Sequence, residues 1–175
     1  MKNQKGAAMV EFAPIALLFF ALLFGIIEFG RAFFVYNTLV EATRRGARVA
    51  TVCPASTNAI TMVQNATIFN SAHEATPITQ TTGLLGLTTA NIQVTYLTAA
   101  MAPITPPLAA NSTTYDTIAF VRVSILPTFT HTLIIPAFTS TFSVPPIETT
   151  LPSESLGRVS SQNPVTQRCC YNLCT

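Results

Sequence analysis

Phe12 to Ile27 reads FAPIALLFFALLFGII, a run of sixteen residues without a charged side chain. As a helix this run would extend about 24 Å, at 1.5 Å per residue. The hydrocarbon core of a bilayer needs about 30 Å, or roughly 20 residues. The sequence therefore predicts a membrane-spanning helix that begins upstream, near Ala7, and that holds Glu11 inside the membrane.

Glu11 is the feature of this span that needs an explanation. A carboxylate inside a membrane costs roughly 2.5 kcal/mol or more, so such residues usually have a partner. Upstream lie Lys2 and Lys5, then Gly6, and Glu11 is the fifth residue after that glycine. A basic leader, a glycine and this glutamate resemble the processing site of type IV prepilins, in which a membrane aspartic protease cuts directly after the glycine.

Cleavage after Gly6 would leave Ala7 at the new N-terminus, with its α-amine within about a turn of the Glu11 carboxylate. The two charges could then compensate each other, within one chain or between neighbouring subunits. The alternative is that Glu11 only marks the membrane edge and extends its side chain into the interface.

A secretory signal peptide is the main competitor to a permanent anchor. It would need a cleavage site of small residues soon after the apolar run. The run is followed instead by Glu28–Phe34, which is bulky and charged. Lys2 and Lys5 predict a cytoplasmic N-terminus by the positive-inside rule, so we expect the rest of the chain on the extracytoplasmic side.

Helical character continues beyond the membrane. Apolar positions recur at near-helical spacing, and Cys53-Pro54 is expected to end the helix because the residue before proline disfavours helical backbone. The predicted helix covers residues 7–52, about 70 Å at 1.5 Å per residue. No bilayer needs that length, so we expect a membrane anchor that continues as a rod.

Oppositely charged residues also follow helical spacing along this rod. Glu28 precedes Arg31 by three residues, and Glu41 precedes Arg44 and Arg45 by three and four. Side chains at these separations are neighbours on a helix surface, so ion pairs are expected at both places.

The second half of the chain predicts a small domain of short elements. We expect a short helix at Ser56–Ala72, a proline-rich loop at Ala102–Leu108, and strands at Asn91–Leu97, Tyr115–Ile125 and Phe138–Val144. Three antiparallel strands packed against the end of the long helix would satisfy this pattern. The apolar segment Leu126–Pro136 is either a strand extension or core loop, or a loop that touches the membrane surface or a neighbouring subunit.

The expected fold is therefore α+β, a long N-terminal transmembrane helix with a small C-terminal domain. We divide the chain into a leader (1–6), the transmembrane and extended helix (7–52), an extracytoplasmic domain (53–157) and a cysteine-containing tail (158–175).

Four cysteines occur, and their spacing does not form a zinc-binding pattern. An even number in an exported domain indicates disulfides, with three possible pairings. Because adjacent cysteines rarely bond to each other, we expect Cys53 to pair with one of the tail cysteines, Cys169, Cys170 or Cys174.

Composition excludes several classes of function. Charged residues make up only 9% of the chain and hydrophobic residues 49%. A net charge of +2 is too small to indicate a nucleic-acid-binding protein. His73 and His131 are isolated, and Asp116 is the only aspartate. We therefore expect no enzymatic activity, no metal and no cofactor.

Three stretches of the first helix resemble the TadE-like family, the minor pilins or pseudopilins of the tight-adherence (Tad, or Flp-type) pilus and secretion system. They are Val10–Phe12, Leu23–Arg31 and Ala42–Arg48, and Glu148–Leu156 resembles the close of the C-terminal domain in some members. The motif positions are Glu11, Phe12, Glu28, Gly30, Arg31, Arg44, Gly46 and Arg48. The resemblance does not explain the tail.

The resemblance implies cleavage between Gly6 and Ala7 by a prepilin peptidase, residence in the bacterial inner membrane, and assembly with other pilins and Tad secretion components. Membrane lipid is the remaining expected partner. The alternative is an unprocessed single-pass anchor that displays a binding or adhesin domain. Met1 would be retained in that case, whereas a processed chain would begin at Ala7.

Overall fold

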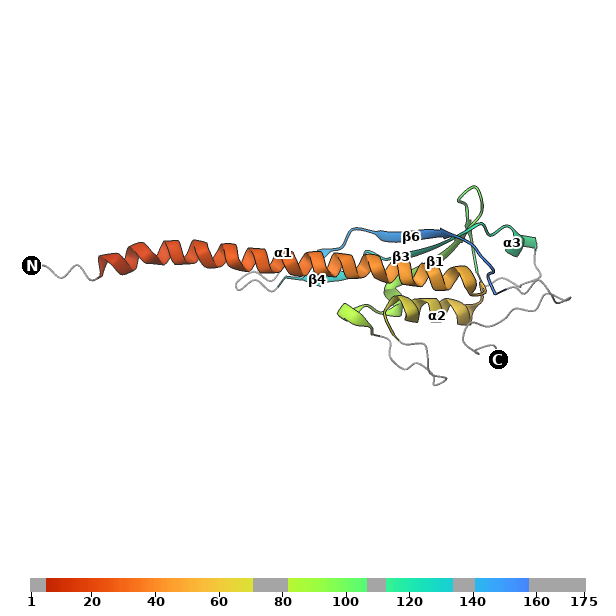
Figure 1. Ribbon diagram of the computed structural model, residues 1–175, viewed down its shortest axis with the longest axis horizontal. Helices are drawn as coiled ribbons and strands as arrows, with labels where there is room; N and C mark the ends of the chain where they lie inside the picture. Colours follow the sequence, from red (N-terminus) through yellow and green to blue (C-terminus); the bar gives the residue numbers. More distant parts are fainter. Residues whose placement is uncertain (1–5, 71–81, 107–112, 134–140, 158–175) are drawn as a thin grey trace, which may run out of the picture.

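A single long helix dominates the molecule. The computed structural model describes residues 6–70, 82–106, 113–133 and 141–157. Helix α1 covers Ala7–Val52, as the sequence predicts, and its N-terminal half extends away from the rest of the chain as a rod (Figure 1). It ends at Cys53, whose extended backbone suits the residue before a proline.

A second helix lies beside the end of the first. Helix α2, Thr57–Thr67, begins after Ser56, whose hydroxyl accepts a hydrogen bond from the Ala59 amide at 3.3 Å. The position of the predicted helix at 56–72 is therefore confirmed, but α2 ends at Thr67, so the predicted helix was too long. Phe69, with a backbone φ of 60°, follows the C-cap residue Ile68. Two short 3₁₀ turns, Leu84–Gly86 and Thr89–Asn91, then lead to the sheet.

The main sheet is antiparallel and has the strand order β2-β1-β3-β6. Its strands are β1 (Ile92–Leu97), β2 (Pro103–Ile104), β3 (Phe120–Ile125) and β6 (Ile147–Pro152). The predicted first strand is confirmed as β1. The second is confirmed only from Phe120 onward, because Thr113–Asp116 form a helical turn, α3.

The predicted third strand was placed in the wrong sheet. Its described part, β5 (Thr141–Ser143), pairs instead with β4 (Thr130–Thr132) in a separate two-stranded sheet. The strand that pairs with β3 on the side opposite β1 is β6, after Pro145 and Pro146. The prediction missed β6 because its inner positions are threonines as well as apolar residues. It also missed β2, which lies in the predicted proline-rich loop.

The core lies between the helices and one face of the main sheet. Helix α1 packs against β3 and β6, while α2 packs against β1. The buried positions of α1 follow helical spacing and include Val35, Leu39, Ala42, Thr43, Gly46, Ala47 and Ala50. They meet the alternating buried residues of the central strands, such as Tyr96, Val121 and Val123. Only the C-terminal half of α1 is therefore part of the core of the C-terminal domain. We call the described part of residues 53–157 the outer domain, because it lies away from the exposed apolar end of α1.

Candidate functional site

The predicted processing site lies at the far end of the rod. Gly6 is exposed and directly precedes the first helical residue, Ala7. Glu11 and Phe12 are both exposed, one turn further along. In the described part of the chain, Glu11 makes no ion pair or side-chain hydrogen bond. Nothing in the outer domain that the structure describes covers this end of α1.

From Met9 to Ile27 no side chain of α1 is buried. Within the described residues, α1 is the one helix that is long and apolar enough to cross a membrane. A groove of about 430 Å³ follows its surface, lined only by apolar side chains between Ile15 and Ile27. This segment would be unfavourable in water, because it exposes a continuous apolar surface. It is suited to a membrane anchor.

The apolar run ends at a group of three polar residues. Arg31 Nη1 donates to both carboxylate oxygens of Glu28, at 2.9 and 2.7 Å, which confirms the predicted ion pair. His131 Nε2, from β4, lies 3.7 Å from Glu28 Oε1. Glu28 and His131 are both buried, with side chains 9% exposed, whereas Arg31 remains 38% exposed.

The sequence indicated that His131 is isolated, and this contact shows that it is not. Its acidic neighbour is 103 positions away in the chain, so no local spacing could reveal the contact. The segment Leu126–Pro136 holds, in its described part, a turn followed by β4 (Thr130–Thr132), and Phe129 and His131 are buried. Residues 134–136, and the other predicted isolated histidine, His73, lie outside the described residues.

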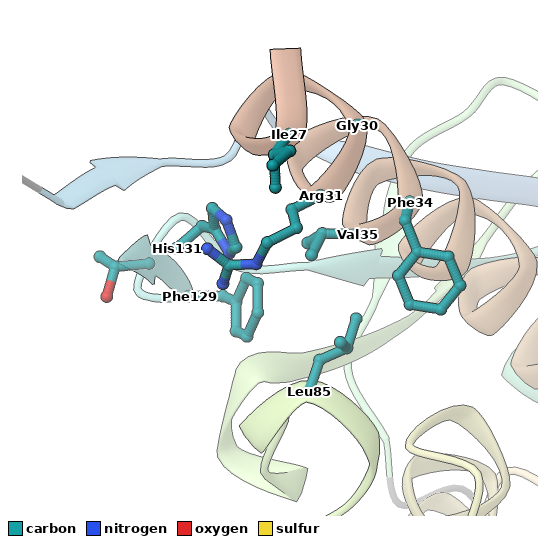
Figure 2. Close-up of a pocket in the computed structure, with 9 residues that line it drawn as sticks. Ile27, Gly30, Arg31, Phe34, Val35, Leu85, Phe129 and His131 are labelled. Carbon is teal, nitrogen blue, oxygen red and sulfur yellow. The ribbon is translucent and has the colours of Figure 1, made fainter. Parts of the chain in front are cut away.

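A cavity of about 660 Å³ opens beside this group. Figure 2 shows Arg31 extending from α1 toward His131 and Phe129, with Leu85 on another side of the cavity. Ile27 belongs both to this cavity and to the apolar groove below it. The two hollows thus share one lining residue and lie one after the other along α1.

Gly30 and Gly46, two motif glycines of α1, differ in what surrounds them. A Cβ built on Gly30, which also lines the cavity, would meet nothing within 4 Å. A Cβ on Gly46 would lie 2.0 Å from Thr67 Oγ1 and 3.3 Å from a Val123 methyl. Gly46 thus permits the close approach of α1 and α2, whereas Gly30 leaves an open surface.

Residues 6–48 match the family model described as "TadE-like protein". This segment of the chain is TadE-like. The match covers 43 of the 175 residues and associates the chain with the Tad pilus system. No curated protein and no solved structure matches the chain.

The TadE-like segment carries an exposed basic group near its end. Arg44 and Arg48 are exposed, and the Arg45 guanidinium lies 5.4 Å from the centroid of the Phe69 ring. Glu41 is exposed as well and, across the described ranges, forms no ion pair with its arginine neighbours. The second predicted intrahelical pair is therefore wrong. Exposed side chains of this length gain little from such a pair because water screens the charges.

Residues 148–156 lie outside the matched segment, so their resemblance to the family stays a prediction, but they contact α1. Thr149, in β6, and Thr43, in α1, join their hydroxyls at 2.9 Å. The amides of Glu154 and Leu156 both donate to the Thr51 carbonyl, at 3.2 Å each. The end of the domain thus holds the C-terminal turn of α1, whose last carbonyls have no partner within the helix.

Tyr115 completes this contact from α3. Its hydroxyl donates to the Leu156 carbonyl and accepts from the Ala55 amide at 3.4 Å. This explains why the strand predicted from Tyr115 does not begin there: the residue turns inward to join the two chain segments. Nearby, burial raises the pKa of Tyr96 above its ordinary range, with a smaller contribution from Tyr115.

Cys53 is fully buried at the end of α1, and its sulfur is in a disulfide. The tail cysteines Cys169, Cys170 and Cys174 lie outside the described residues, so the pairing stays a prediction. Over the ranges that the structure describes, no group of three or more His, Cys, Asp or Glu residues could hold a metal ion.

Proposed function

We propose that the chain is a minor pilin, or pseudopilin, of the Tad system. A prepilin peptidase would cut after Gly6, and the mature chain would reside in the inner membrane with its N-terminus cytoplasmic and the outer domain extracytoplasmic. It would then join other pilins and Tad secretion components during pilus assembly. The proposed role is structural and involves no catalysis or cofactor.

The observation that carries this proposal is the difference in burial between the two halves of α1. The C-terminal half is embedded in the outer domain, whereas the stretch from Met9 to Ile27 has no buried side chain. A tether alone would need only the membrane span. A helix that is rigidly attached to a domain and apolar along its other half can instead pack against equivalent helices.

Glu11 has a defined role in this proposal. In the membrane it would lack water, and the described part of the chain offers it no cation. The α-amine released at Ala7, on the same or a neighbouring subunit, would supply one. Pairing between subunits would make burial of both charges more favourable in the assembly than in a solitary chain.

The first experiment tests processing. Mass spectrometry of the chain from native membranes is expected to show an N-terminus at Ala7. Gly6→Ser should leave an unshortened precursor when the cognate peptidase is present. Gly25→Ser is the matched control, because a Cβ at Gly25 also meets nothing within 4 Å. A native chain that keeps Met1 would contradict the proposal and support the unprocessed anchor with a binding domain.

The second experiment tests Glu11 itself. Glu11→Gln is expected to insert into the membrane normally but to reach the pilus fraction at about a tenth of the wild-type amount or less, as measured by immunoblotting. Glu41→Gln is the control, since this exposed carboxylate lies on the same helix outside the membrane. Equal incorporation of both variants would refute the charge-pairing role.

We also propose that the disulfide of Cys53 joins the end of α1 to the tail. Non-reducing peptide mapping should recover Cys53 linked to Cys169, Cys170 or Cys174. A Cys53 peptide recovered as a link between two chains would contradict this pairing.

A further inference from the structure

The apolar groove and the Arg31 cavity meet at Ile27, and together they have the dimensions of one lipid; we call this pair of hollows the path. The groove runs from Ile15 to Ile27. Twelve residues of helix cover about 18 Å, close to the roughly 15 Å of hydrocarbon in one leaflet. Arg31 lies one turn beyond Ile27, about 6 Å along the axis. The headgroup layer of a bilayer adds about 5 to 7 Å on each side, so Arg31 falls within it.

The polar end of this path offers a cation for a phosphate group. Arg31 uses only Nη1 for both bonds to Glu28, and its side chain is 38% exposed. Within the part of the chain that is described, its other two nitrogens make no hydrogen bond. Glu28 is covered, so the charge that faces the cavity is the guanidinium. A guanidinium that keeps two donors can bind phosphate while it holds a carboxylate.

The surroundings of the cavity suit a membrane surface. Phe33 and Phe34 are exposed at this level of α1, and Phe129, Thr130 and Leu85 line the cavity. Phenylalanine and leucine side chains can lie at the boundary between headgroups and acyl chains, as on the apolar face of interfacial helices. The open space above Gly30 keeps the path unobstructed between its apolar and polar ends.

We infer that this path binds a phospholipid of the extracytoplasmic leaflet, with an acyl chain along the groove and the phosphate on Arg31. The inference rests on the proposed insertion of α1 into the membrane and on its proposed orientation. It does not depend on cleavage after Gly6 or on pilus assembly. The bound lipid would fix the depth of the outer domain above the bilayer, because the headgroup is held at the junction of α1 with β4.

The test is native mass spectrometry of the full chain in a maltoside detergent with added phosphatidylglycerol. The wild-type chain is expected to retain the lipid. The double variant Glu28→Gln/Arg31→Gln removes both charges but keeps amides that can bond to each other, and it should bind at least about tenfold more weakly. Arg48→Gln is the matched control, because it removes an exposed arginine from the same helix about 25 Å further along the axis.

Two further probes separate the possible occupants. Diacylglycerol with the same acyl chains lacks the phosphate and should be retained more weakly than phosphatidylglycerol. Inorganic phosphate lacks the chains and should not displace the lipid. Arg31→Lys keeps the charge but must serve Glu28 and the phosphate from one nitrogen, so it should bind more weakly than the wild type and more tightly than the double variant. A thermal melt of each variant establishes that the domain is folded.

The inference is overturned by equal lipid retention in the double variant and the wild type, or by an equal loss in Arg48→Gln. Equal retention of diacylglycerol would show that the phosphate is not recognised. Displacement by inorganic phosphate would indicate a free-anion site. A second copy of the chain bound in place of lipid, lost on the same substitutions, would assign the path to a subunit contact.

Discussion

The substitution Gly46→Ala tests the packing of α1 against the outer domain. The new Cβ would lie 2.0 Å from Thr67 Oγ1, so Thr67 must move. Thr67 Oγ1 donates to the Val63 carbonyl at 2.7 Å, and the residue is fully buried. Overpacking of this kind costs about 1–3 kcal/mol, and loss of the hydrogen bond costs about 1 kcal/mol more.

Alanine also favours the helix by about 1 kcal/mol relative to glycine, which offsets part of this cost. We therefore expect Gly46→Ala to lower the free energy of unfolding by about 2 kcal/mol. For a domain of about 100 residues this corresponds to a fall in Tm on the order of 10 °C.

The assay is thermal unfolding in detergent, followed by near-ultraviolet circular dichroism. The chain has no tryptophan and four tyrosines. Tyr96 and Tyr115 are both buried in the outer domain, so the signal reports on its packing and not on the membrane helix.

Gly30→Ala is the matched control, because a Cβ there meets nothing within 4 Å. It should gain up to about 1 kcal/mol from helix propensity alone. The double variant Gly46→Ala/Thr67→Ala should lose less stability than the sum of the two single substitutions, because it lacks the Thr67 hydroxyl that the new Cβ would otherwise overlap. If Gly46→Ala is as stable as Gly30→Ala, the proposed close approach of α1 and α2 is refuted.

Three further substitutions probe the closure of the domain. Tyr115→Phe removes the hydroxyl that joins Ala55 and Leu156 and should cost about 1–3 kcal/mol in chemical unfolding, whereas Tyr36→Phe, at an exposed position, should be neutral. Thr149→Val leaves the Thr43 hydroxyl without its partner in β6 and should cost about 1 kcal/mol by the same measurement; an unchanged midpoint would contradict the contact. Because burial raises the pKa of Tyr96, the folded chain holds the Tyr96 proton more tightly than the unfolded chain. The resulting contribution to the free energy of unfolding is fully present below the pKa of an unfolded tyrosine, about 10, and is lost as the pH rises above that value. Tyr96→Phe should therefore flatten the alkaline loss of stability, and spectrophotometric titration should detect no early ionisation of Tyr96 in the folded chain.

The helix was predictable because its signals are local. The apolar run, the continued helical spacing and Cys53-Pro54 can all be read from neighbouring residues, and α1 ends where they indicate. Strand β1 has a clean alternation for the same reason.

Features that depend on contacts distant in the sequence were not predictable. Strand β6 is attached to α1 through a threonine hydroxyl pair as well as through apolar residues, so its pattern lacks a clear alternation. The neighbour of Glu28 is His131, on a strand whose position is set by the whole sheet. The predicted loop at 102–108 holds β2, whose two residues pair with the end of β1.

The attachment of Glu154 and Leu156 to Thr51 has a consequence for biogenesis. Because β6 completes both the sheet and the cover over α1, a chain still under synthesis lacks one of the two strands that pair with β3. Until residues 147–156 have emerged, the edge of β3 stays open to pairing with other chains. The main sheet can therefore be completed only after residues 147–156 have been synthesised.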